Sequence, residues 1–239
     1  MIVLEGRDLG FSYHETTAPS WERPEERPLF SGLSFQLHAG ECLALTGPSG
    51  AGKSTLCQLL AGIIPRTRPL GRRWGQALLL GEEVSTLPLA QVASQLGMVF
   101  QDADSQLFSP LVEDELAFGP ENLCLPRPEI EARISQALEL TRMTCFRQAR
   151  IDALSGGQRQ LIALAAVLAC RPRVLLLDEA FAMLDWETVT HLRGVLRQLL
   201  DEGTAVLMVE HEAERLDIAD TVYQLQEDGL RRWEGSPND

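Results

Sequence analysis

Residues 41–54 read ECLALTGPSGAGKS, and this stretch decides the fold. Its first half is a short apolar run, typical of a buried strand, and its second half is a glycine-rich turn. The turn fits the pattern G-x-x-x-x-G-K-[S/T], in which a strand leads into a phosphate-binding loop and a helix follows. We expect that helix to begin at Lys53 and to reach about Ala61, because Gly62 and Pro65 would stop it.

The residue types of this loop suit a nucleoside triphosphate. Glycines let the backbone curl so that N–H groups point at phosphate, and the helix N-terminus adds the positive end of its dipole. Lys53 would neutralise the β- and γ-phosphates, the Ser54 hydroxyl would bind Mg²⁺, and Thr55 would assist at the α-phosphate. The loop alone predicts nucleotide binding and no particular activity, because kinases, GTPases and many ATPases share it. The predicted nucleotide-binding residues here are Gly47, Pro48, Ser49, Gly50, Ala51, Gly52, Lys53, Ser54 and Thr55.

Alternating apolar runs and amphipathic segments predict an α/β fold with a mostly parallel sheet. Residues 174–177 and 205–209 are wholly apolar, as strands buried on both faces of a parallel sheet require. Residues 96–100 indicate another short buried strand. Residues 186–200 have helical periodicity, with apolar side chains recurring on one face.

The N-terminal part reads as short strands. Apolar and aromatic residues at close spacing predict strands at residues 2–4, 10–13 and 33–37. A proline- and glutamate-rich stretch at residues 15–28 predicts an exposed loop among them. Residues 77–80 indicate one more strand, followed by a turn at Gly81.

A helical region follows, from Pro110 to about Arg147. Its clearest helix has an apolar face at i, i+4, i+7 and i+8, made by Ile130, Ile134, Ala137 and Leu138. A second helix is expected from Ser155 to near Cys170, before Pro172.

Two acids follow the apolar run at residues 174–177. Asp178 would emerge at the carboxyl end of a parallel strand, where open α/β sheets bind their ligands, and we expect it to hold Mg²⁺ through water. Glu179, one residue further on, would act as general base for the water that attacks the γ-phosphate, or would orient that water. The plainer interpretation, two solvated acids at a strand end, is disfavoured by the phosphate-binding loop in the same chain.

Residues 154–160 read LSGGQRQ and stand just before the acidic strand. Ser155 is a good helix N-cap, so a simple cap is one interpretation. Two adjacent glycines at a helix start cost stability, however, unless the backbone must approach another group closely. The exposed N-terminus of a long helix is also an anion site. We therefore expect Ser155, Gly156, Gly157 and Gln158 to contact the γ-phosphate held by another copy.

The composition excludes several other classes. A net charge of −13 over 239 residues disfavours nucleic-acid binding and direct docking on anionic lipid. No apolar run reaches the roughly 18 residues that a membrane-spanning helix needs, and the N-terminus does not resemble a secretory signal. Five scattered cysteines without a C-x-x-C pair argue against a disulfide framework and against a zinc site.

The order of these motifs resembles the ATP-binding subunits of ABC transporters. A phosphate-binding loop, a glutamine, L-S-G-G-Q, an apolar strand with Asp-Glu and then a histidine occur in that sequence over almost the whole chain. The resemblance implies a single ABC-type P-loop NTPase domain over residues 1–239. In it, residues 1–100 and 165–239 would form the nucleotide-binding core with an N-terminal antiparallel β subdomain, and residues 101–164 a helical subdomain. In this family two subunits hold two ATP molecules between them, with Mg²⁺ as the cofactor.

The resemblance assigns four further positions. Tyr13 matches the aromatic residue that stacks on adenine, with Phe11 as the alternative. Gln101 matches the glutamine that touches Mg²⁺ and the attacking water, and His211 matches the histidine that contacts the γ-phosphate. Asp185 matches the loop that crosses to the other subunit. That loop departs from the family pattern at two positions, Phe181 and Trp186, which leaves its geometry open.

Residues 99–108 and 112–122 are most similar to the ATPases of energy-coupling-factor transporters, which drive uptake of vitamins and transition-metal ions. This resemblance implies a second ATPase subunit, identical or different, a transmembrane coupling protein and a small substrate-binding membrane protein. The chain would then lie at the cytoplasmic face of the cell membrane, without spanning it. We further hypothesise that an acidic cluster meets basic residues of the membrane partner: Asp102, Asp104, Glu113, Asp114 and Glu115.

Two alternatives stay open from the sequence. The chain could serve an importer that uses a soluble binding protein, or act as a soluble ABC ATPase without a transport role. A DNA-repair ATPase is disfavoured, because it would need a long insertion between the phosphate-binding loop and L-S-G-G-Q, and a basic surface.

Overall fold

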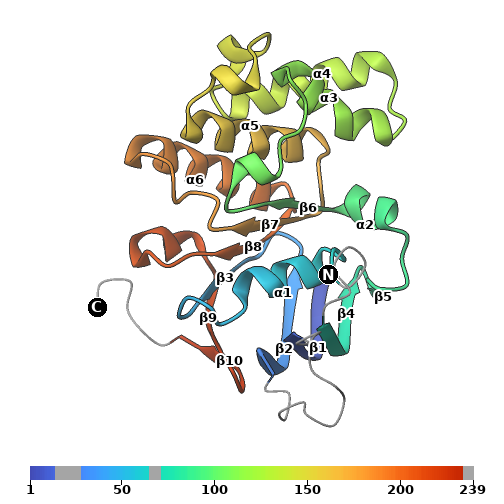
Figure 1. Cartoon of the computed structure of the whole chain (residues 1–239), viewed down its shortest axis with the longest axis vertical. Helices are drawn as coiled ribbons and strands as arrows, with labels where there is room; N and C mark the ends of the chain where they lie inside the picture. Colours follow the sequence, from blue (N-terminus) through green and yellow to red (C-terminus); the bar gives the residue numbers. More distant parts are fainter. Residues whose placement is uncertain (14–27, 65–70, 234–239) are drawn as a thin grey trace, which may run out of the picture.

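The computed structural model describes residues 1–13, 28–64 and 71–233, so the predicted loop at residues 15–28 lies almost wholly outside it, as does Pro65. A six-stranded sheet lies between a four-stranded sheet and a layer of helices (Figure 1).

The six-stranded sheet is built around strands buried along their whole length. Every residue of β7 (Val174–Asp178) and β8 (Ala205–Val209) is buried, as the apolar runs predicted. The sheet order is β10 (Gly229–Arg232), β9 (Thr221–Gln226), β3 (Cys42–Thr46), β8, β7 and β6 (Leu96–Val99). All neighbouring pairs are parallel except β10 with β9, which confirms a mostly parallel α/β core.

The second sheet is antiparallel, in the order β2 (Phe30–His38), β1 (Ile2–Tyr13), β4 (Gly71–Leu79) and β5 (Glu82–Glu83). The prediction of separate strands at residues 2–4 and 10–13 is wrong, because β1 runs through both. Its register against β4 shifts between Arg7 and Gly10, where Asp8 has a φ of 48°. This bulge interrupts the apolar pattern, and the sequence therefore looks like two strands.

Helix α1 (Lys53–Leu60) connects the two sheets. Three of its side chains, Leu56, Leu59 and Leu60, are fully buried in a core shared by both sheets. The helix contacts β7 of one sheet and β4 of the other. Because α1 is held on both sides, the phosphate-binding loop in front of it is fixed at the end of β3.

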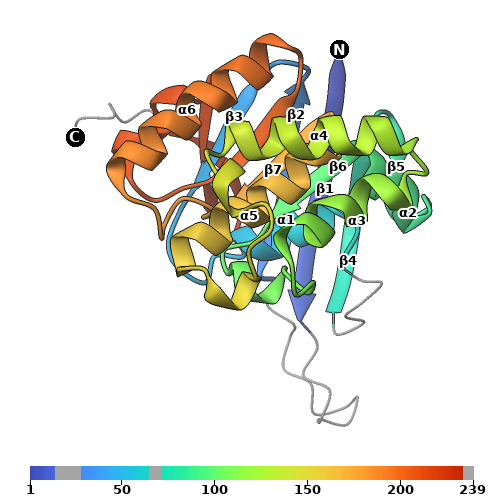
Figure 2. The same cartoon turned by 90° about the horizontal axis from the view of Figure 1, so that it is seen from above.

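Helices α3 (Val112–Asn122), α4 (Arg127–Leu140) and α5 (Gly156–Ala169) pack on one another at one end of the molecule (Figures 1 and 2). The predicted face of α4 is inside: Ile134, Ala137 and Leu138 are buried, and Ile130 is partly buried against the same core. α5 also contacts β6, so it joins the helical layer to the sheet. The expected subdomain limit at residue 164 falls within α5, and that division stays a prediction.

Of two further helices, the sequence predicted one. α6 (Trp186–Asp201) is the amphipathic helix expected from the periodicity of residues 186–200. Neither α2 (Leu89–Gln95) nor the β9–β10 hairpin was predicted. Among the described helices, none is long and apolar enough to cross a membrane.

The burial of β7 makes a direct stability prediction. Leu176 is 0% exposed in the middle of this strand. Leu176→Ala should lower the free energy of unfolding by about 2–5 kcal/mol, because it removes buried methyl groups and leaves a cavity. Leu89→Ala is the matched control, since Leu89 is 43% exposed, and it should change stability by less than about 0.5 kcal/mol. Urea unfolding measures both. Equal effects would contradict the assignment of β7 to the core.

Candidate functional site

The phosphate-binding loop, residues 47–54, joins β3 to α1. Its Lys53 is 5% exposed, and the Nζ ammonium donates hydrogen bonds to the carbonyl oxygens of Gly47 (2.9 Å) and Pro48 (3.0 Å). Burial lowers the pKa of Lys53, and the nearby carboxylates of Glu179 and Asp178 act in the opposite direction. The loop therefore carries a cation that is mostly withdrawn from water and faces acidic groups.

Glycine is required in this loop for two separate reasons. Gly52, the N-cap of α1, has a φ of 97°, which disfavours any residue with a Cβ. A Cβ there would also lie 2.8 Å from side-chain atoms of Leu29 and Phe30. The loop thus packs closely against the Leu29 and Phe30 side chains at the start of β2, and this packing helps to fix its curvature.

Asp178 is the last residue of β7 and is 3% exposed. The Ser54 hydroxyl donates a hydrogen bond to its Oδ1 atom at 3.0 Å. Burial raises the pKa of Asp178, and the neighbouring Glu179 carboxylate adds to this increase. A buried carboxylate and a hydroxyl, held together, form a small set of oxygen donors.

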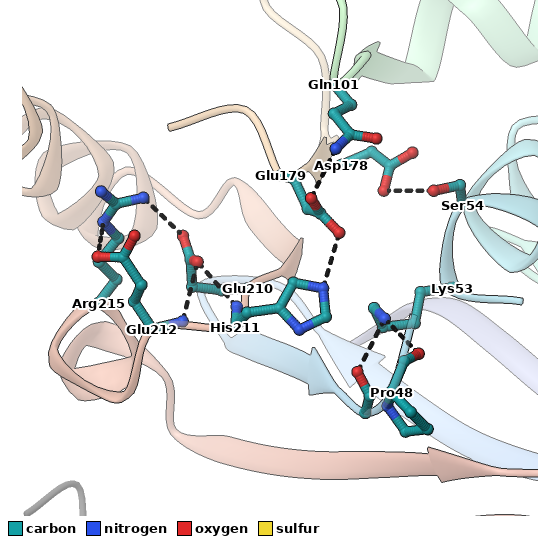
Figure 3. Close-up of polar contacts among 11 residues, drawn as sticks. Pro48, Lys53, Ser54, Gln101, Asp178, Glu179, Glu210, His211, Glu212 and Arg215 are labelled. Carbon is teal, nitrogen blue, oxygen red and sulfur yellow. Dashed lines mark hydrogen bonds and ion pairs between the residues drawn. The ribbon is translucent and has the colours of Figure 1, made fainter. Parts of the chain in front are cut away.

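Glu179 has two side-chain partners from different elements. Gln101 donates from Nε2 to its Oε2 atom at 2.7 Å, and His211 Nε2 lies in hydrogen-bond contact with Oε1 at 2.8 Å (Figure 3). The backbone of Glu179 has a φ of 49°, which is unusual for a residue with a side chain, and its N–H donates to the Val209 carbonyl at 3.2 Å. Such conformations cost energy and are found preferentially at functional sites.

These side chains converge because neighbouring parallel strands end at the same edge. The phosphate-binding loop follows β3, Gln101 follows β6, Asp178 ends β7 with Glu179 directly after it, and His211 follows β8. Ligands of open α/β sheets bind at this carboxyl edge. The structure therefore brings together five predicted site residues: Ser54, Gln101, Asp178, Glu179 and His211.

The L-S-G-G-Q segment forms a separate group. Ser155 is the N-cap of α5 and makes a capping box with Gln158: its Oγ accepts from Gln158 N at 3.3 Å, and Gln158 Oε1 accepts from Ser155 N at 2.8 Å. Ser155, Gly157, Gln158 and Asp185 line one hollow of about 370 Å³. A different hollow, of about 530 Å³, is lined by residues 48–51 of the phosphate-binding loop. Within one chain, the two groups do not share a pocket among those described.

Tyr13 and its alternative, Phe11, have opposite environments. Tyr13 is 52% exposed and its hydroxyl is 2.8 Å from that of Thr55, at the start of α1. Phe11 is 1% exposed, and its ring meets the edge of Tyr13 at 4.8 Å between centroids. Only Tyr13 of these two therefore presents a ring at the surface beside the phosphate-binding loop.

The loop after Glu179 contains Phe181 and Trp186, the two residues that depart from the family pattern, and their surroundings differ. Phe181 is buried in the core of the helical side, so its departure from the family pattern is a packing feature. Trp186 is exposed, with its ring 6.0 Å from the Arg193 guanidinium. Between them, Asp185 caps α6 by accepting from Thr188 N at 2.9 Å, a bond that lowers the pKa of Asp185.

One buried acid near the site was not predicted. Glu210 is 5% exposed between Val209 and His211, and its Oε1 accepts from His211 N at 2.8 Å. The only sequence signal was its place directly after a buried strand and before the histidine.

A phosphate-binding loop, an acidic strand end and a helix-capping L-S-G-G-Q on this fold define an ATPase of the ABC type. The family model described as ABC transporter matches residues 30–182, and the chain belongs to that family. The predicted ABC-type fold and ATPase activity are thereby confirmed.

Comparison with named proteins shows which kind of ABC transporter ATPase this chain resembles. The chain is 35% identical to the energy-coupling factor transporter ATP-binding protein EcfA of Methanocaldococcus jannaschii, over 100% of this chain and 81% of the relative. It is 36% identical to the protein of the same name from Methanothermobacter thermautotrophicus, over 98% and 71%. Among solved structures, cbiO1 from Clostridium perfringens, part of the ABC transporter complex cbiONQ, matches with a TM-score of 0.79 and 28% identity, over 99% of this chain and 89% of that one. The predicted similarity to energy-coupling-factor ATPases is confirmed.

Proposed function

We propose that this chain is the ATP-hydrolysing subunit of an energy-coupling-factor-type uptake transporter. The observation that carries the proposal is the convergence of Asp178, Glu179, Gln101 and His211 at the end of the phosphate-binding loop. The near full-length similarity to EcfA proteins supports the transporter class. The transported compound, a vitamin or a transition-metal ion in this group, would be recognised by another subunit.

The residues beside the phosphate-binding loop suit Mg²⁺. Magnesium prefers hard oxygen ligands and takes few of them from protein, the rest coming from water and phosphate. The Ser54 hydroxyl and the Asp178 carboxylate supply such oxygens, and Gln101, which is predicted to touch Mg²⁺, is hydrogen-bonded to the neighbouring Glu179. Among the residues described, no group of three or more His, Cys, Asp or Glu side chains could hold a metal ion. Bound Mg²⁺ would neutralise charge on the β- and γ-phosphates.

The chain's own side chains divide the work of hydrolysis. Lys53 would bind the β- and γ-phosphates, and the nearby carboxylates of Glu179 and Asp178 favour its charged form and oppose the effect of burial on its pKa. Glu179 would orient the attacking water and accept its proton. Gln101 and His211 hold one carboxylate oxygen each, so the Glu179 side chain cannot turn freely. Tyr13 would stack on adenine.

A second ATPase subunit would complete each site. The exposed start of α5, with Ser155 and the two glycines, offers backbone N–H groups to an anion. Because this group lies in a different hollow from the phosphate-binding loop of its own chain, it would serve the γ-phosphate held by the other copy. Asp185 lines the same hollow and would lie at that interface.

Three acids of the predicted cluster have partners within the chain, and docking through the cluster stays a prediction. Glu113 forms an ion pair with Arg147 at 2.5 Å, and Asp104 forms one with Arg159 at 2.6 Å. Glu115 is buried and accepts from the backbone N–H groups of residues 108 and 109. These acids have partners within the chain, so a charge reversal at Glu113 would disturb the helical layer itself.

An exposed aromatic pair is the better docking surface for the membrane partner. Phe108 and Phe118 are 63% and 50% exposed, and their rings meet edge to face at 4.6 Å. Residues 101–111 lead directly from Gln101 to α3, which carries Phe118. We infer that a cytoplasmic segment of the transmembrane coupling protein covers this pair and places the chain at the cytoplasmic face of the membrane.

Glu179→Gln tests the chemistry. The amide keeps the shape of the side chain but accepts protons poorly, so kcat should fall by about 100-fold or more. The affinity for ATP should stay within a few-fold, because the phosphate-binding loop is untouched. Glu214→Gln, an exposed change in the segment after His211, is the matched control and should keep wild-type turnover. Normal turnover by Glu179→Gln would remove Glu179 from this role.

Affinity purification from native membranes in mild detergent tests the transporter class. Mass spectrometry should identify a transmembrane coupling protein together with a small substrate-binding membrane protein. A Phe108→Ser/Phe118→Ser variant should recover less of both while the purified variant still hydrolyses ATP. The energy-coupling-factor assignment would be overturned if a permease with a soluble binding protein, or no membrane protein, were recovered. Neither result would contradict the proposed ATP hydrolysis.

A further inference from the structure

Glu210 is a buried carboxylate at the end of β8, next to the candidate site. Its backbone N–H still belongs to the sheet, donating to the Leu45 carbonyl of β3 at 3.1 Å. Its side chain reaches the two residues that follow it, where Oε1 accepts from the N–H groups of His211 (2.8 Å) and Glu212 (3.1 Å), as Figure 3 shows. One carboxylate oxygen therefore fixes the backbone of two successive residues.

The other oxygen of Glu210 faces a buried cation. Arg215 is 8% exposed, and its Nη1 lies 3.7 Å from Glu210 Oε2, while its Nε lies 3.1 Å from Glu212 Oε2 (Figure 3). Arg215 thus makes ion-pair contacts with the acids at both ends of the short turn that carries His211, without a hydrogen bond from its Nε or Nη1 atom to any described residue. We call Glu210, Glu212 and Arg215 the carboxylate clamp.

The clamp is fastened to the rest of the molecule through the helical turn η4 (Ala213–Ile218), which carries Arg215. Leu216 and Ile218 of this turn are buried in the core. Asp217 forms ion pairs with Arg193 and Arg197 of α6. The turn is therefore held by the core and by α6. Because Arg215 belongs to this turn, its guanidinium is held next to the Glu210 carboxylate.

The geometry points to Glu210 as a positioning residue that aims His211 at Glu179. The His211 side chain is 37% exposed, so packing alone leaves its imidazole room to turn. Its Nε2 nevertheless meets Glu179 Oε1 at 2.8 Å. Fixing the backbone of His211 from behind, through its own N–H, sets the direction in which the ring leaves the chain. This inference rests on the proposed function, because it assumes that His211 supports hydrolysis.

A stability role explains the clamp less well. A buried ion pair gains little over apolar side chains of the same size, because both charges must lose their water. The neighbouring strand residues show that this region accepts apolar side chains, since Val209 and Met208 are buried beside it. A carboxylate does what an apolar residue does not: it accepts hydrogen bonds from two backbone N–H groups, while the nearby guanidinium offsets its charge.

Kinetics of the full-length chain separate positioning from folding. Glu210→Ala should lower kcat for ATP by about 10- to 100-fold, because a displaced His211 no longer supports Glu179. KM for ATP should change by less than about threefold, since binding rests on the phosphate-binding loop and Tyr13. Glu210→Gln keeps an oxygen for the two N–H groups and should recover most of the lost kcat. Glu129→Ala, which breaks the ion pair of Glu129 with Arg133 in α4 (2.6 Å), is the control and should turn over normally.

The double variant with His211→Ala gives the decisive comparison. If Glu210 acts through His211, adding Glu210→Ala to His211→Ala should lower kcat no further. Additive losses of kcat in the double variant would overturn the positioning role of Glu210. So would a folded Glu210→Ala variant with wild-type kcat if His211→Ala is slow. Neither outcome would contradict the proposed role of His211. Wild-type turnover by His211→Ala itself would overturn the proposed role of His211, and with it this inference. Melting temperatures of all variants identify any that fail to fold. If Glu210→Ala does, Arg215→Lys replaces it: this change should lower kcat in the wild-type background and lower it no further in His211→Ala, and additive losses would again overturn the positioning role.

Discussion

Burial of β7 on both faces is the constraint on which the site depends. A strand of five buried residues must lie inside the sheet, with β6 and β8 paired to it in parallel. Its neighbours then end at the same edge, and the groups that follow them, Gln101 and His211, reach the Glu179 side chain from opposite sides. The apolar core thus brings together polar groups that are distant in the sequence.

At this carboxyl edge of the sheet, buried charges of opposite sign lie near each other within the chain. Burial raises the pKa of Asp178 and lowers that of Lys53, so each group alone would tend towards its neutral form. Because their charges lie close enough to interact, each favours the charged form of the other. The same logic applies behind His211, where Arg215 faces Glu210. Charged groups are buried here in complementary sets.

Much of this site could be predicted, and the limits have physical causes. The phosphate-binding loop, Asp178 and Glu179 were predictable because local residue types and spacing carry their chemistry. Gln101 and His211 required the family resemblance, since a lone glutamine or histidine has no local signature. The carboxylate clamp was missed because its Glu210–Arg215 pair forms only once η4 folds back on β8. The continuous strand β1 was missed for a similar reason, because its bulge at Asp8 shows only in the pairing with its neighbours, β2 and β4.

The most direct test of the whole account is the structure of the Glu179→Gln variant with ATP and Mg²⁺. Two copies should face each other, with each triphosphate on the phosphate-binding loop of one copy and its γ-phosphate at Ser155 of the other. His211 should point at that γ-phosphate with its backbone N–H still bound to Glu210. A triphosphate bound by one copy alone, or a γ-phosphate remote from both His211 and the substituted side chain at the end of β7, would contradict it.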